Sequence, residues 1–535
     1  MRTSLRRAAL WAATPALALS TLAVTAPTAG AYSEARVGAL ESAPVAGAAG
    51  WLSGQLTNGL LVNEQYTFTD VGLTVDAALG LDAVGDDESV AVVAGAVDDP
   101  DTLRGYIGDG EGEAYAGSTA KALLLAQVAE VDPTTFGGVD LVSRLESLVV
   151  AEGDAAGRIK DRSAWGDYAN VIGQAYAVEG LDAAGSELTD PATDFLLRQQ
   201  CAAGYFRLYL PAADAAQGTC DTAGAPASID ATAIAVRALL PQADDLDVAP
   251  RVATALNWLE SQQAEDGSLG SGDGEVANTN STGLAGWAFG LAGHDQAAAD
   301  AADWVVERQA GTADACRPNA LRHDLGAIAY DDAGRSAGEV DGITVEAQDQ
   351  WRRASAQALP ALQWLSSKQP MGDVRVDGPR RFSQGSYSLS VSGLAEGEQA
   401  CLRGPGLRDL LVGEDSAAYE IKAPARTTRR NYTLTRLGAA PVTVGTTVLA
   451  ARKLPITLQK QRVAAGKRQT VRIRGLEAGE KVTVRFRGQR VDRGHAGPAG
   501  RFVSTFRVLG DTGRAKIKVV GQFANRTNRK GFWVR

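Results

Sequence analysis

Histidine, cysteine and methionine are scarce in this sequence. Its 535 residues include three histidines, four cysteines and two methionines. No two cysteines have the short spacing of a zinc finger or zinc ribbon, in which four cysteine or histidine ligands lie close together. The sequence therefore predicts no metal site, and nothing in it calls for a cofactor.

Long apolar runs are also missing, with one exception at the N-terminus. Three arginines precede an apolar stretch over residues 8–24, and the small residues 29–31 follow. This order is typical of a secretory signal peptide, which we assign to residues 1–31. A retained membrane anchor is the alternative, but Pro15 interrupts the stretch. No other segment has the roughly 18 apolar residues that a membrane span needs, so we expect a secreted or cell-surface protein.

The four cysteines are Cys201, Cys220, Cys316 and Cys401. An even number in a chain that is expected to be exported favours disulfides over metal ligands. Cys201 and Cys220 would close a short loop between two predicted helices, and we expect them to be joined. For Cys316 and Cys401, pairing and no pairing stay equally open. A bond between these two would tie the helical part to the segment that follows it.

The net charge of -10 conceals two regions of opposite sign. Residues 32–371 contain 18 Lys and Arg against 51 Asp and Glu, whereas residues 372–535 contain 32 against 12. The sign changes where the helical periodicity ends. Two independent signals thus predict a domain boundary near residue 370.

Short amphipathic runs that begin with an aromatic residue recur along the first part of the chain. Most of them end in glutamine, and their starts are tens of residues apart. A repeat of this length is typical of a helical array, in which each helix pair must stack on its neighbours to bury its apolar face. The runs begin at Trp51, Phe195, Trp258, Trp304 and Trp364, although Trp364 also suits the end of a helix of the second set.

This second set of predicted helices is rich in alanine and glycine. Small side chains allow neighbouring backbones to approach closely, which suits an inner ring with the aromatic-led helices outside. With weaker outer copies at residues 101–107 and 142–149, six pairs are predicted. We therefore expect an all-α (α/α)6 toroid over residues 32–370. The second set opens at Asp76, Ser118, Asn170, Asp230, Ser281 and Asp349.

After residue 371 the periodicity changes from helical to alternating. Residues 387–392 and 470–474 alternate apolar and polar side chains as half-buried strands do. Each is followed by a near-identical Gly-Leu turn, and the two turns are 82 residues apart. This offset predicts two β-sandwich modules of immunoglobulin-like size, over residues 371–455 and 456–535.

The second β module is strongly basic. In an exported protein the expected anionic partners are cell-envelope polymer, acidic lipid or the protein's own acidic toroid, and no nucleic acid is expected. A solvated strand face without a partner is an equally good interpretation. The basic residues include Arg485, Arg487, Arg490, Arg493, Arg526, Arg529 and Lys530.

Residues 258–270 read Trp-Leu-Glu-Ser-Gln-Gln-Ala-Glu-Asp-Gly-Ser-Leu-Gly. They resemble the repeat of squalene cyclases and protein prenyltransferase β subunits, the prenyltransferase/squalene oxidase repeat. The resemblance covers residues 51–366 as architecture and implies a terpenoid cyclase-like α/α toroid. Secreted cobalamin carriers use a similar toroid, so the resemblance implies a fold and leaves the function open.

The resemblance to class II terpenoid cyclases implies a proton-donating acid in an Asp-x-Asp-Asp-Thr-Ala motif. The corresponding residues 228–233 keep the central carboxyl as Asp230, but Ser228 and Ala231 replace the flanking carboxyls. Protonating an alkene needs a strong, positioned acid, which a lone aspartate does not provide. We therefore expect Asp230 to be a helix N-cap, while it stays a candidate catalytic residue.

Protein prenyltransferases hold zinc through an aspartate, a cysteine and a histidine of the toroid. Here the toroid histidines, His294 and His323, have no suitably placed cysteine on an inner helix, and Cys201 and Cys220 are better explained as a disulfide. Prenyl transfer is therefore not expected.

Helical toroids also occur in glycosidases and polysaccharide lyases, in which carboxylates with tyrosine, histidine or arginine line the mouth. On this hypothesis His323 and Tyr330 are candidate catalytic residues. Surface aromatics and helix caps have the same composition, and this interpretation is favoured over catalysis. The candidate ligand-binding residues are Asp167, Tyr168, Asp230, Trp287, Asp324 and Trp351.

The leading hypothesis is a secreted or surface-associated, non-catalytic protein. It would bind a glycan, a lipid or a corrinoid in the toroid and envelope polymer through its basic β modules. The reason is a toroid without a complete catalytic set. A glycan-active hydrolase or lyase and a degenerate class II terpenoid cyclase are the alternatives.

Overall fold

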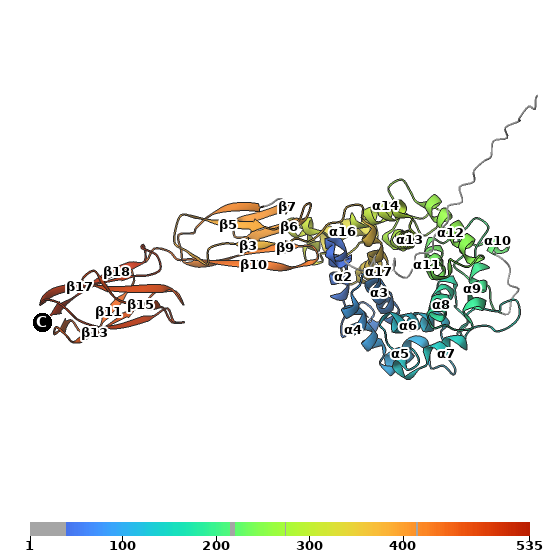
Figure 1. Cartoon of the computed structure of the whole chain (residues 1–535), viewed down its shortest axis with the longest axis horizontal. Helices are drawn as coiled ribbons and strands as arrows, with labels where there is room; N and C mark the ends of the chain where they lie inside the picture. Colours follow the sequence, from blue (N-terminus) through green and yellow to red (C-terminus); the bar gives the residue numbers. More distant parts are fainter. Residues whose placement is uncertain (1–38, 214–219, 273, 414–415) are drawn as a thin grey trace, which may run out of the picture.

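The computed structural model describes residues 39–213, 220–272, 274–413 and 416–535. The signal peptide expected at residues 1–31 lies outside these residues. A ring of helices is followed by two regions of β-strands that extend from one side of the ring, so the chain is elongated (Figure 1). No helix in the described ranges is long and apolar enough to cross a membrane.

Six of the described helices form a closed inner ring. Each contacts the next one in chain order, and the last also contacts the first. The helical character predicted for this part of the chain is confirmed. The six helices are α3 (Val71–Ala83), α6 (Ala116–Val128), α8 (Val171–Ala183), α11 (Ile229–Leu239), α13 (Thr279–Leu291) and α17 (Gln348–Ala358).

Further helices lie outside this ring, and each inner helix packs against an outer neighbour. The longer ones are α2 (Ala43–Ser53), α4 (Asp87–Val97), α5 (Pro100–Ile107), α7 (Leu141–Glu146), α9 (Thr189–Leu197), α12 (Val248–Gln262), α14 (Asp295–Val306) and α16 (Asp332–Asp341). Shorter elements complete the region: η1 (Ala39–Glu41), β1 (Val62–Asn63), β2 (Phe68–Thr69), η2 (Phe136–Gly138), α10 (Cys220–Ala223), η3 (Leu240–Gln242), α15 (Thr312–Cys316), η4 (Ala320–His323) and η5 (Leu359–Trp364). Trp364 thus ends η5, which directly follows the inner helix α17 and is not an outer helix.

The N-cap of α11 is Ser228, not Asp230. The Ser228 hydroxyl accepts a hydrogen bond from the backbone N–H of Ala231 at 3.2 Å. Asp230 is the second residue of the helix, and its carboxylate accepts a hydrogen bond from the Ser281 hydroxyl of α13 at 2.6 Å. The prediction that Asp230 caps the helix is therefore wrong, because a serine two positions earlier already satisfies the free backbone donor.

A similar shift occurs at the start of α3. Asp70 caps this helix by accepting a hydrogen bond from the backbone N–H of Leu73 at 2.8 Å. Asp76, which was predicted to open the helix, consequently lies in its second turn. The Asp76 side chain does not cap the helix, and it lines the cavity inside the ring.

Glycines bring neighbouring inner helices into close contact. A Cβ atom on Gly173 of α8 would lie 3.2 Å from the Cα atom of Gly117 on α6. A Cβ atom on Gly283 of α13 would lie 2.4 Å from the Cα atom of Ala358 on α17. Larger residues at these positions would push the helices apart. The structure thus contains the close helix approach that was predicted from the small residues.

The strands form two regions with the same strand order. Among the described residues of the first, the sheets are β3-β5-β8 and β4-β10-β9-β6-β7; in the second they are β11-β13-β16 and β12-β18-β17-β14-β15. Each strand therefore has a counterpart eight strands later. In each region apolar side chains from both sheets form one buried cluster, so both are two-layer β structures. Their β-rich character is confirmed, and the immunoglobulin-like assignment stays a prediction.

The strands of the first region are β3 (Arg375–Asp377), β4 (Arg381–Phe382), β5 (Ser386–Ser392), β6 (Gln399–Gly404), β7 (Leu407–Val412), β8 (Ser416–Lys422), β9 (Thr428–Arg436) and β10 (Ala439–Val448). Those of the second are β11 (Ile456–Leu458), β12 (Arg462–Val463), β13 (Arg468–Ile473), β14 (Lys481–Phe486), β15 (Gln489–His495), β16 (Phe502–Arg507), β17 (Gly513–Val520) and β18 (Thr527–Val534). All strand pairs are antiparallel except β4 with β10 and β12 with β18, within the described sheets.

Disulfides join Cys201 to Cys220 and Cys316 to Cys401. The first bond was expected and is confirmed. The second was left open by the sequence, and it ties α15 of the helical region to β6 of the first β region.

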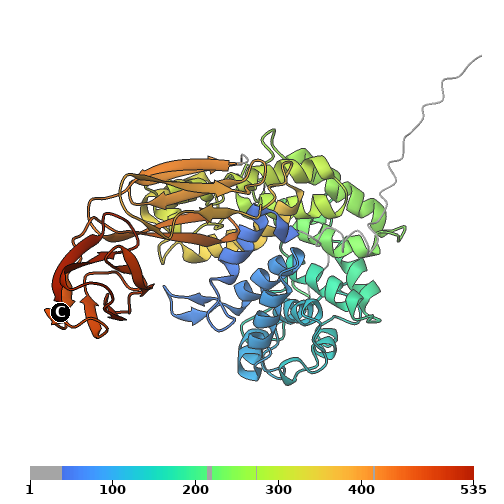
Figure 2. The same cartoon turned by 60° about the vertical axis from the view of Figure 1, so that its left-hand side comes forward.

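Hydrogen bonds support the same junction between the ring and the first β region. The Arg403 guanidinium donates to the backbone carbonyl of Ala315 at 3.1 Å. The backbone N–H of Leu437 donates to the hydroxyl of Thr312 at 3.0 Å. The first β region accordingly lies against the helices in both views (Figures 1 and 2).

Candidate ligand cavity

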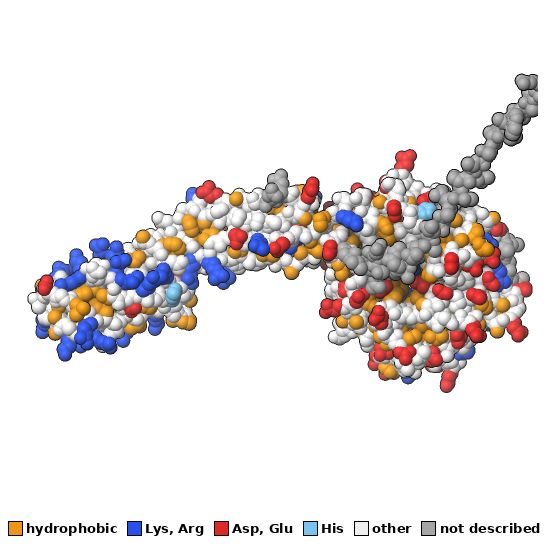
Figure 3. Space-filling model, viewed as in Figure 1, with side chains coloured by type: hydrophobic (Ala, Val, Ile, Leu, Met, Phe, Trp, Pro, Cys, Tyr) orange, Lys and Arg blue, Asp and Glu red, His pale blue; other side chains and the backbone are white. Residues whose placement is uncertain are grey.

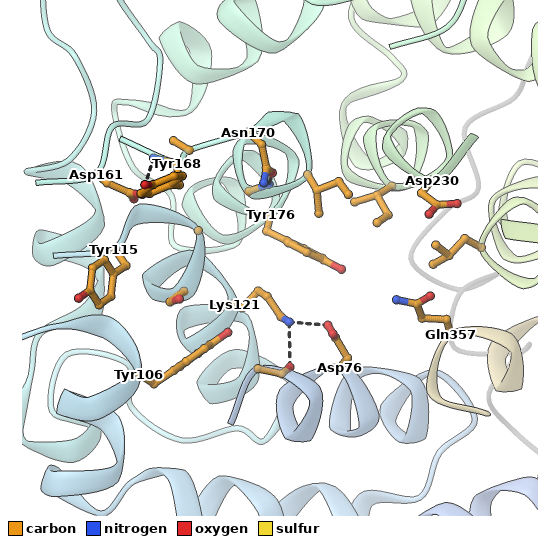
Figure 4. A pocket seen from close by; sticks show the side chains of 18 residues that line it. Asp76, Tyr106, Tyr115, Lys121, Asp161, Tyr168, Asn170, Tyr176, Asp230 and Gln357 are labelled. Carbon is orange, nitrogen blue, oxygen red and sulfur yellow. Dashed lines mark hydrogen bonds and ion pairs between the residues drawn. The ribbon is translucent and has the colours of Figure 1, made fainter. Parts of the chain in front are cut away.

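A cavity of about 550 Å³ lies inside the ring. All six inner helices contribute to its wall (Figure 4). Its volume falls in the range of small-molecule sites, about 300–1,000 Å³. The lining residues are Gly72, Asp76, Tyr106, Tyr115, Gly117, Ser118, Lys121, Asp161, Tyr168, Ala169, Asn170, Ile172, Gly173, Tyr176, Asp230, Ile234, Leu284 and Gln357.

An ion pair between two inner helices stands in this wall. The Lys121 ammonium of α6 lies 2.5 Å from the carboxylate of Asp76 on α3, and it also donates to the backbone carbonyl of Gly72 at 2.9 Å. Burial is the largest single effect on the pKa of Lys121 and lowers it. The combined interactions with Asp76 and two nearby tyrosines outweigh burial, so the net effect is a raised pKa. The Lys121 ammonium is therefore protonated at neutral pH and stands in the cavity wall beside the Asp76 carboxylate.

Tyrosine rings flank this pair. Tyr106 comes from the outer helix α5 and Tyr176 from the inner helix α8, and Figure 4 shows both rings near the Lys121 side chain. Burial raises the pKa of both tyrosine hydroxyls, and the negative charge of Asp76 acts in the same direction. Both hydroxyls are thus neutral at physiological pH and can donate and accept hydrogen bonds.

Asp230 occupies another part of the wall, near Gln357 (Figure 4). Burial raises the pKa of its carboxyl, while the hydrogen bond from Ser281 acts in the opposite direction. Asp230 therefore holds a proton more readily than an exposed aspartate does. Asp76 and Asp230 line one cavity in different environments, because only Asp76 has a cationic partner among the described residues.

Asp161, the third carboxyl in the wall, holds the loop before α8 in place through hydrogen bonds. Its two oxygens accept hydrogen bonds from the backbone N–H groups of Ala116 at 2.7 Å and Tyr168 at 3.0 Å. Asp167, a predicted ligand-binding residue, pairs with the buried Arg158 at 2.6 Å and is not part of the wall. Tyr168, predicted for the same role, does line the cavity.

A second cleft of about 700 Å³ lies between the ring and the first β region. His323 and Asp324 line it together with Arg322, and Arg403 of β6 lines the same cleft. The indole N–H of Trp51 donates to the Asp324 carboxylate at 3.4 Å. These two candidate residues are thus in a different cavity from Asp230, and the structure does not bring the predicted set together.

The remaining predicted residues are packed to different degrees. Trp351 is 2% exposed in an apolar cluster and does not line the axial cavity. Trp287 is also buried, and the Arg237 guanidinium lies 4.4 Å from its ring centroid. Burial raises the pKa of Tyr330, and the negative charge of Asp230 adds to this effect.

Sequence reasoning missed Lys121, Tyr106, Tyr176 and Gln357 as site residues, and it assigned Asp76 only to the start of a helix. A signal for part of the wall is nevertheless present in the sequence. In α3, α6, α8 and α11, two lining residues are separated by four positions, which places both on one face of the helix. The pairs are Gly72 with Asp76, Gly117 with Lys121, Ile172 with Tyr176, and Asp230 with Ile234.

In the described parts of the chain, no group of three or more His, Cys, Asp or Glu side chains could hold a metal ion. No family model matches the sequence, and no curated protein matches it.

Solved structures show low similarity to this chain. A protein from Actinoplanes is 17% identical, covers 61% of this chain and 100% of its own, and has a TM-score of 0.41. The type II terpene cyclase MstE from Scytonema is 15% identical over 60% of this chain and 96% of its own, at 0.42. Fibronectin(III)-like modules of CbhA from Clostridium thermocellum are 8% identical over 30% and 92%, at 0.20. The helical ring and the β regions are established by the contacts of the chain itself and not by these likenesses.

Proposed function

We propose that the axial cavity binds a neutral, polyhydroxylated ligand such as a short oligosaccharide. The composition of the wall carries this proposal, because hydrogen-bonding groups stand there beside tyrosine rings. A sugar hydroxyl both donates and accepts hydrogen bonds, and Lys121, Asp76 and Gln357 offer partners of both kinds. The tyrosine rings can cover the apolar face of a sugar ring.

A lipid or a corrinoid, the other ligands expected from the sequence, suits this wall less well. A lipid tail makes no hydrogen bonds, so it would displace water from the polar groups around Lys121 and offer them no hydrogen bond in exchange. A corrinoid offers its cobalt to a histidine or another soft ligand, and no lining residue is histidine or cysteine. The glycan hypothesis is therefore the one we retain for the cavity.

We place this binding outside the cytosol. Disulfides persist in oxidising compartments, and two disulfides are present in the described chain. The signal peptide predicted at residues 1–31 agrees with export. The proposal is thus a secreted or cell-surface glycan-binding protein.

Isothermal titration of the full chain against neutral oligosaccharides of increasing length tests the proposal. The critical variant is Gln357→Trp, which fills the cavity without removing an ion pair. Gln296→Trp is the matched control, because Gln296 is exposed on the outer helix α14. We expect Gln357→Trp to weaken binding at least about tenfold, a loss of about 1.4 kcal/mol, while the control binds like the wild type.

Binding that survives Gln357→Trp would place the ligand elsewhere and contradict the proposal. So would saturable binding of a single-chain lipid or a corrinoid in the absence of any binding by the oligosaccharides. Circular dichroism and the unfolding midpoint of both variants show whether the fold is intact, so that loss of binding is not mistaken for loss of structure.

A second candidate function is acid–base cleavage of such a glycan. The observation in its favour is that Asp76 is ion-paired while burial raises the pKa of Asp230, since a pair of carboxyls in different environments can divide the roles of base and acid. Incubation of the full chain with oligosaccharides distinguishes the two functions. Release of shorter products that is abolished by both Asp76→Asn and Asp230→Asn would establish cleavage, and intact ligand after prolonged incubation would exclude it for the glycans tested.

The degenerate terpenoid cyclase stays a third hypothesis, and the polar wall argues against it. A cyclisation cavity must shield a carbocation from nucleophiles, and the tyrosine hydroxyls and Asp76 would be exposed to it here. Incubation with a linear polyprenyl substrate tests the hypothesis. A cyclic product that disappears with Asp230→Asn would replace our proposal.

A further inference from the structure

Four cations lie side by side across the five-stranded sheet of the second β region. On β14 and β15, Arg485 lies directly opposite Arg490. On the other side of β14, Arg485 lies opposite Lys518 of β17. Lys518 in turn lies opposite Arg529 of β18. Because directly opposed residues of antiparallel strands point to the same face, the four side chains form one row on the open face of the sheet.

Further cations extend this row along the same face. Arg493 pairs with Thr483 of β14, and Lys481 pairs with His495, all on the side of Arg485. Lys516 and Arg514 continue the same alternation on β17. A groove of about 440 Å³ follows part of the row, and it is lined by Arg485, Arg487, Gly488, Arg514, Ala515, Lys516, Lys518 and Arg529.

The four cations of the row have no ion-pair partner among the described residues. Within the described ranges, no ion pair joins any of the four row cations to a carboxylate. Among the described residues, the Arg485 side chain donates one hydrogen bond, to the backbone carbonyl of Gly488 at 3.1 Å. Residues 456–535 contain 20 Lys and Arg against 4 Asp and Glu. Figure 3 shows Lys and Arg side chains gathered over this end of the molecule.

Like charges directly opposite one another destabilise a sheet. Repulsion between the cations of the row therefore destabilises the sheet, and a bound anion would remove this repulsion. The other sheet of the same region has less repulsion between opposed cations. In its described strands β13 and β16, Arg468 and Arg507 are directly opposed, whereas Arg472 lies opposite Val503.

The length of the row favours a polymer over a single small anion. Neighbouring strands are about 4.8 Å apart, so four cations span about 14 Å. One phosphate reaches only the nearest of them, whereas a chain with an anionic group every few ångströms neutralises the whole row. Trp533 is the one exposed large aromatic on this face among the described residues, so the series of stacking rings by which proteins hold single-stranded nucleic acid is missing.

We propose that this face, defined by Arg490, Arg485, Lys518 and Arg529, is a binding site for a linear polyanion with closely repeated phosphate groups and no stacking bases. It would hold the chain to such a polymer whatever the axial cavity binds. The binding is electrostatic and follows the release of counterions, so it weakens steeply as salt is added.

The test uses the full chain and long-chain inorganic polyphosphate as the probe. The variant is the triple substitution Arg485→Ala, Lys518→Ala and Arg529→Ala. The matched control is Arg468→Ala, Arg472→Ala and Arg507→Ala, which removes three exposed cations from the opposite sheet. Affinity is measured at several salt concentrations. Single-stranded DNA and vesicles that contain the anionic lipid phosphatidylglycerol are compared with polyphosphate.

We expect polyphosphate to bind the wild type at low salt and the triple row variant about 100-fold more weakly. The slope of log affinity against log salt should fall by about 2 in the row variant. The control triple should bind within about threefold of the wild type, which is a change of about 0.6 kcal/mol. The unfolding midpoint of the row variant should be unchanged or raised, because like-charge repulsion is removed.

Three results would overturn the proposal. The first is no binding of polyphosphate at low salt, and the second is an equal loss in both triple variants. The third is tighter binding of single-stranded DNA or of the anionic vesicles than of polyphosphate, which would make a nucleic acid or a membrane the partner.

Discussion

Lys121 and Asp76 form an ion pair across two inner helices, and their side chains are only 15% and 16% exposed. The pair links α6 to α3 in the wall of the axial cavity, where Tyr106 and Tyr176 lie beside it. It therefore has two roles: it fixes the spacing of two neighbouring inner helices, and it presents opposite charges to whatever enters the cavity.

Removing one partner of this pair should cost more than removing both. We expect Lys121→Met to lower the free energy of unfolding by about 2 kcal/mol, because it leaves the Asp76 carboxylate largely buried without its cation. The double variant Lys121→Met with Asp76→Leu should recover at least half of this loss. Urea denaturation of the wild type, both single variants and the double variant gives the coupling energy, and simple additivity would contradict the prediction.

The pH dependence of stability should change when Asp230 is replaced by asparagine. Burial raises the pKa of Asp230 above its usual 3.8, so the folded state binds this proton more tightly than the unfolded chain. Its contribution to stability is complete below pH 3.8 and is lost as the pH rises through the raised pKa. The loss is about 1.4 kcal/mol for each pH unit between the pKa values of the unfolded and folded states. Asp230→Asn lacks this ionisation, so its stability relative to the wild type should increase from pH 3 to pH 7.

Urea denaturation at several pH values measures this difference for Asp230→Asn. Asp101→Asn is the control, because the Asp101 side chain is 91% exposed on the outer helix α5. Its profile should run parallel to that of the wild type. A parallel profile for Asp230→Asn as well would show that Asp230 does not titrate differently in the folded protein.

The inner ring was predictable from the sequence because alanine and glycine at helical spacing have one physical reason to recur, which is close helix packing. The contacts of Gly173 and Gly283 are the direct outcome. The wall of the cavity was less predictable. Which residues face the axis depends on how each helix is rotated, and this rotation is fixed by contacts between helices that are far apart in the chain.

Asp230 illustrates the difference. Its sequence context suits an N-cap, and only the structure shows that Ser228 takes this role and turns the aspartate toward Ser281, 51 residues later. Local propensity favours several neighbouring residues equally, and tertiary packing chooses among them.

The two disulfides should differ in their contribution to stability. Loop closure predicts that replacing Cys316 and Cys401 by serine costs about 4–5 kcal/mol, because 85 residues separate them, whereas replacing Cys201 and Cys220, separated by 19, costs about 3 kcal/mol. Urea denaturation of both double variants without reductant gives the order. The reverse order would show that the hydrogen bonds of Arg403 and Leu437 hold the junction without the bond between Cys316 and Cys401.

The near-identical turns of the two β regions each contain a buried glutamate. We expect the two glutamates to contribute unequally to the stability of their regions. Glu480 and Arg526 are 0% exposed, with N–O distances of 2.7 and 2.8 Å, and Glu480 also accepts the backbone N–H of Glu477 at 2.9 Å. The counterpart Glu398 pairs with Arg436 at 2.7 Å, but Arg436 is 11% exposed. A cation left alone in a dry site costs more than one that water can reach.

We therefore expect Glu480→Gln to destabilise the second β region by about 3–5 kcal/mol, and Glu398→Gln to cost the first one less. Calorimetry of the full chain reports both, since each substitution should shift the transition of its own region. Glu396→Gln is the control, because Glu396 is exposed two positions before Glu398. Equal shifts for Glu480→Gln and Glu398→Gln would mean that the exposure of the arginine does not set the cost, and a shift as large for Glu396→Gln would mean that the turn responds to any loss of negative charge.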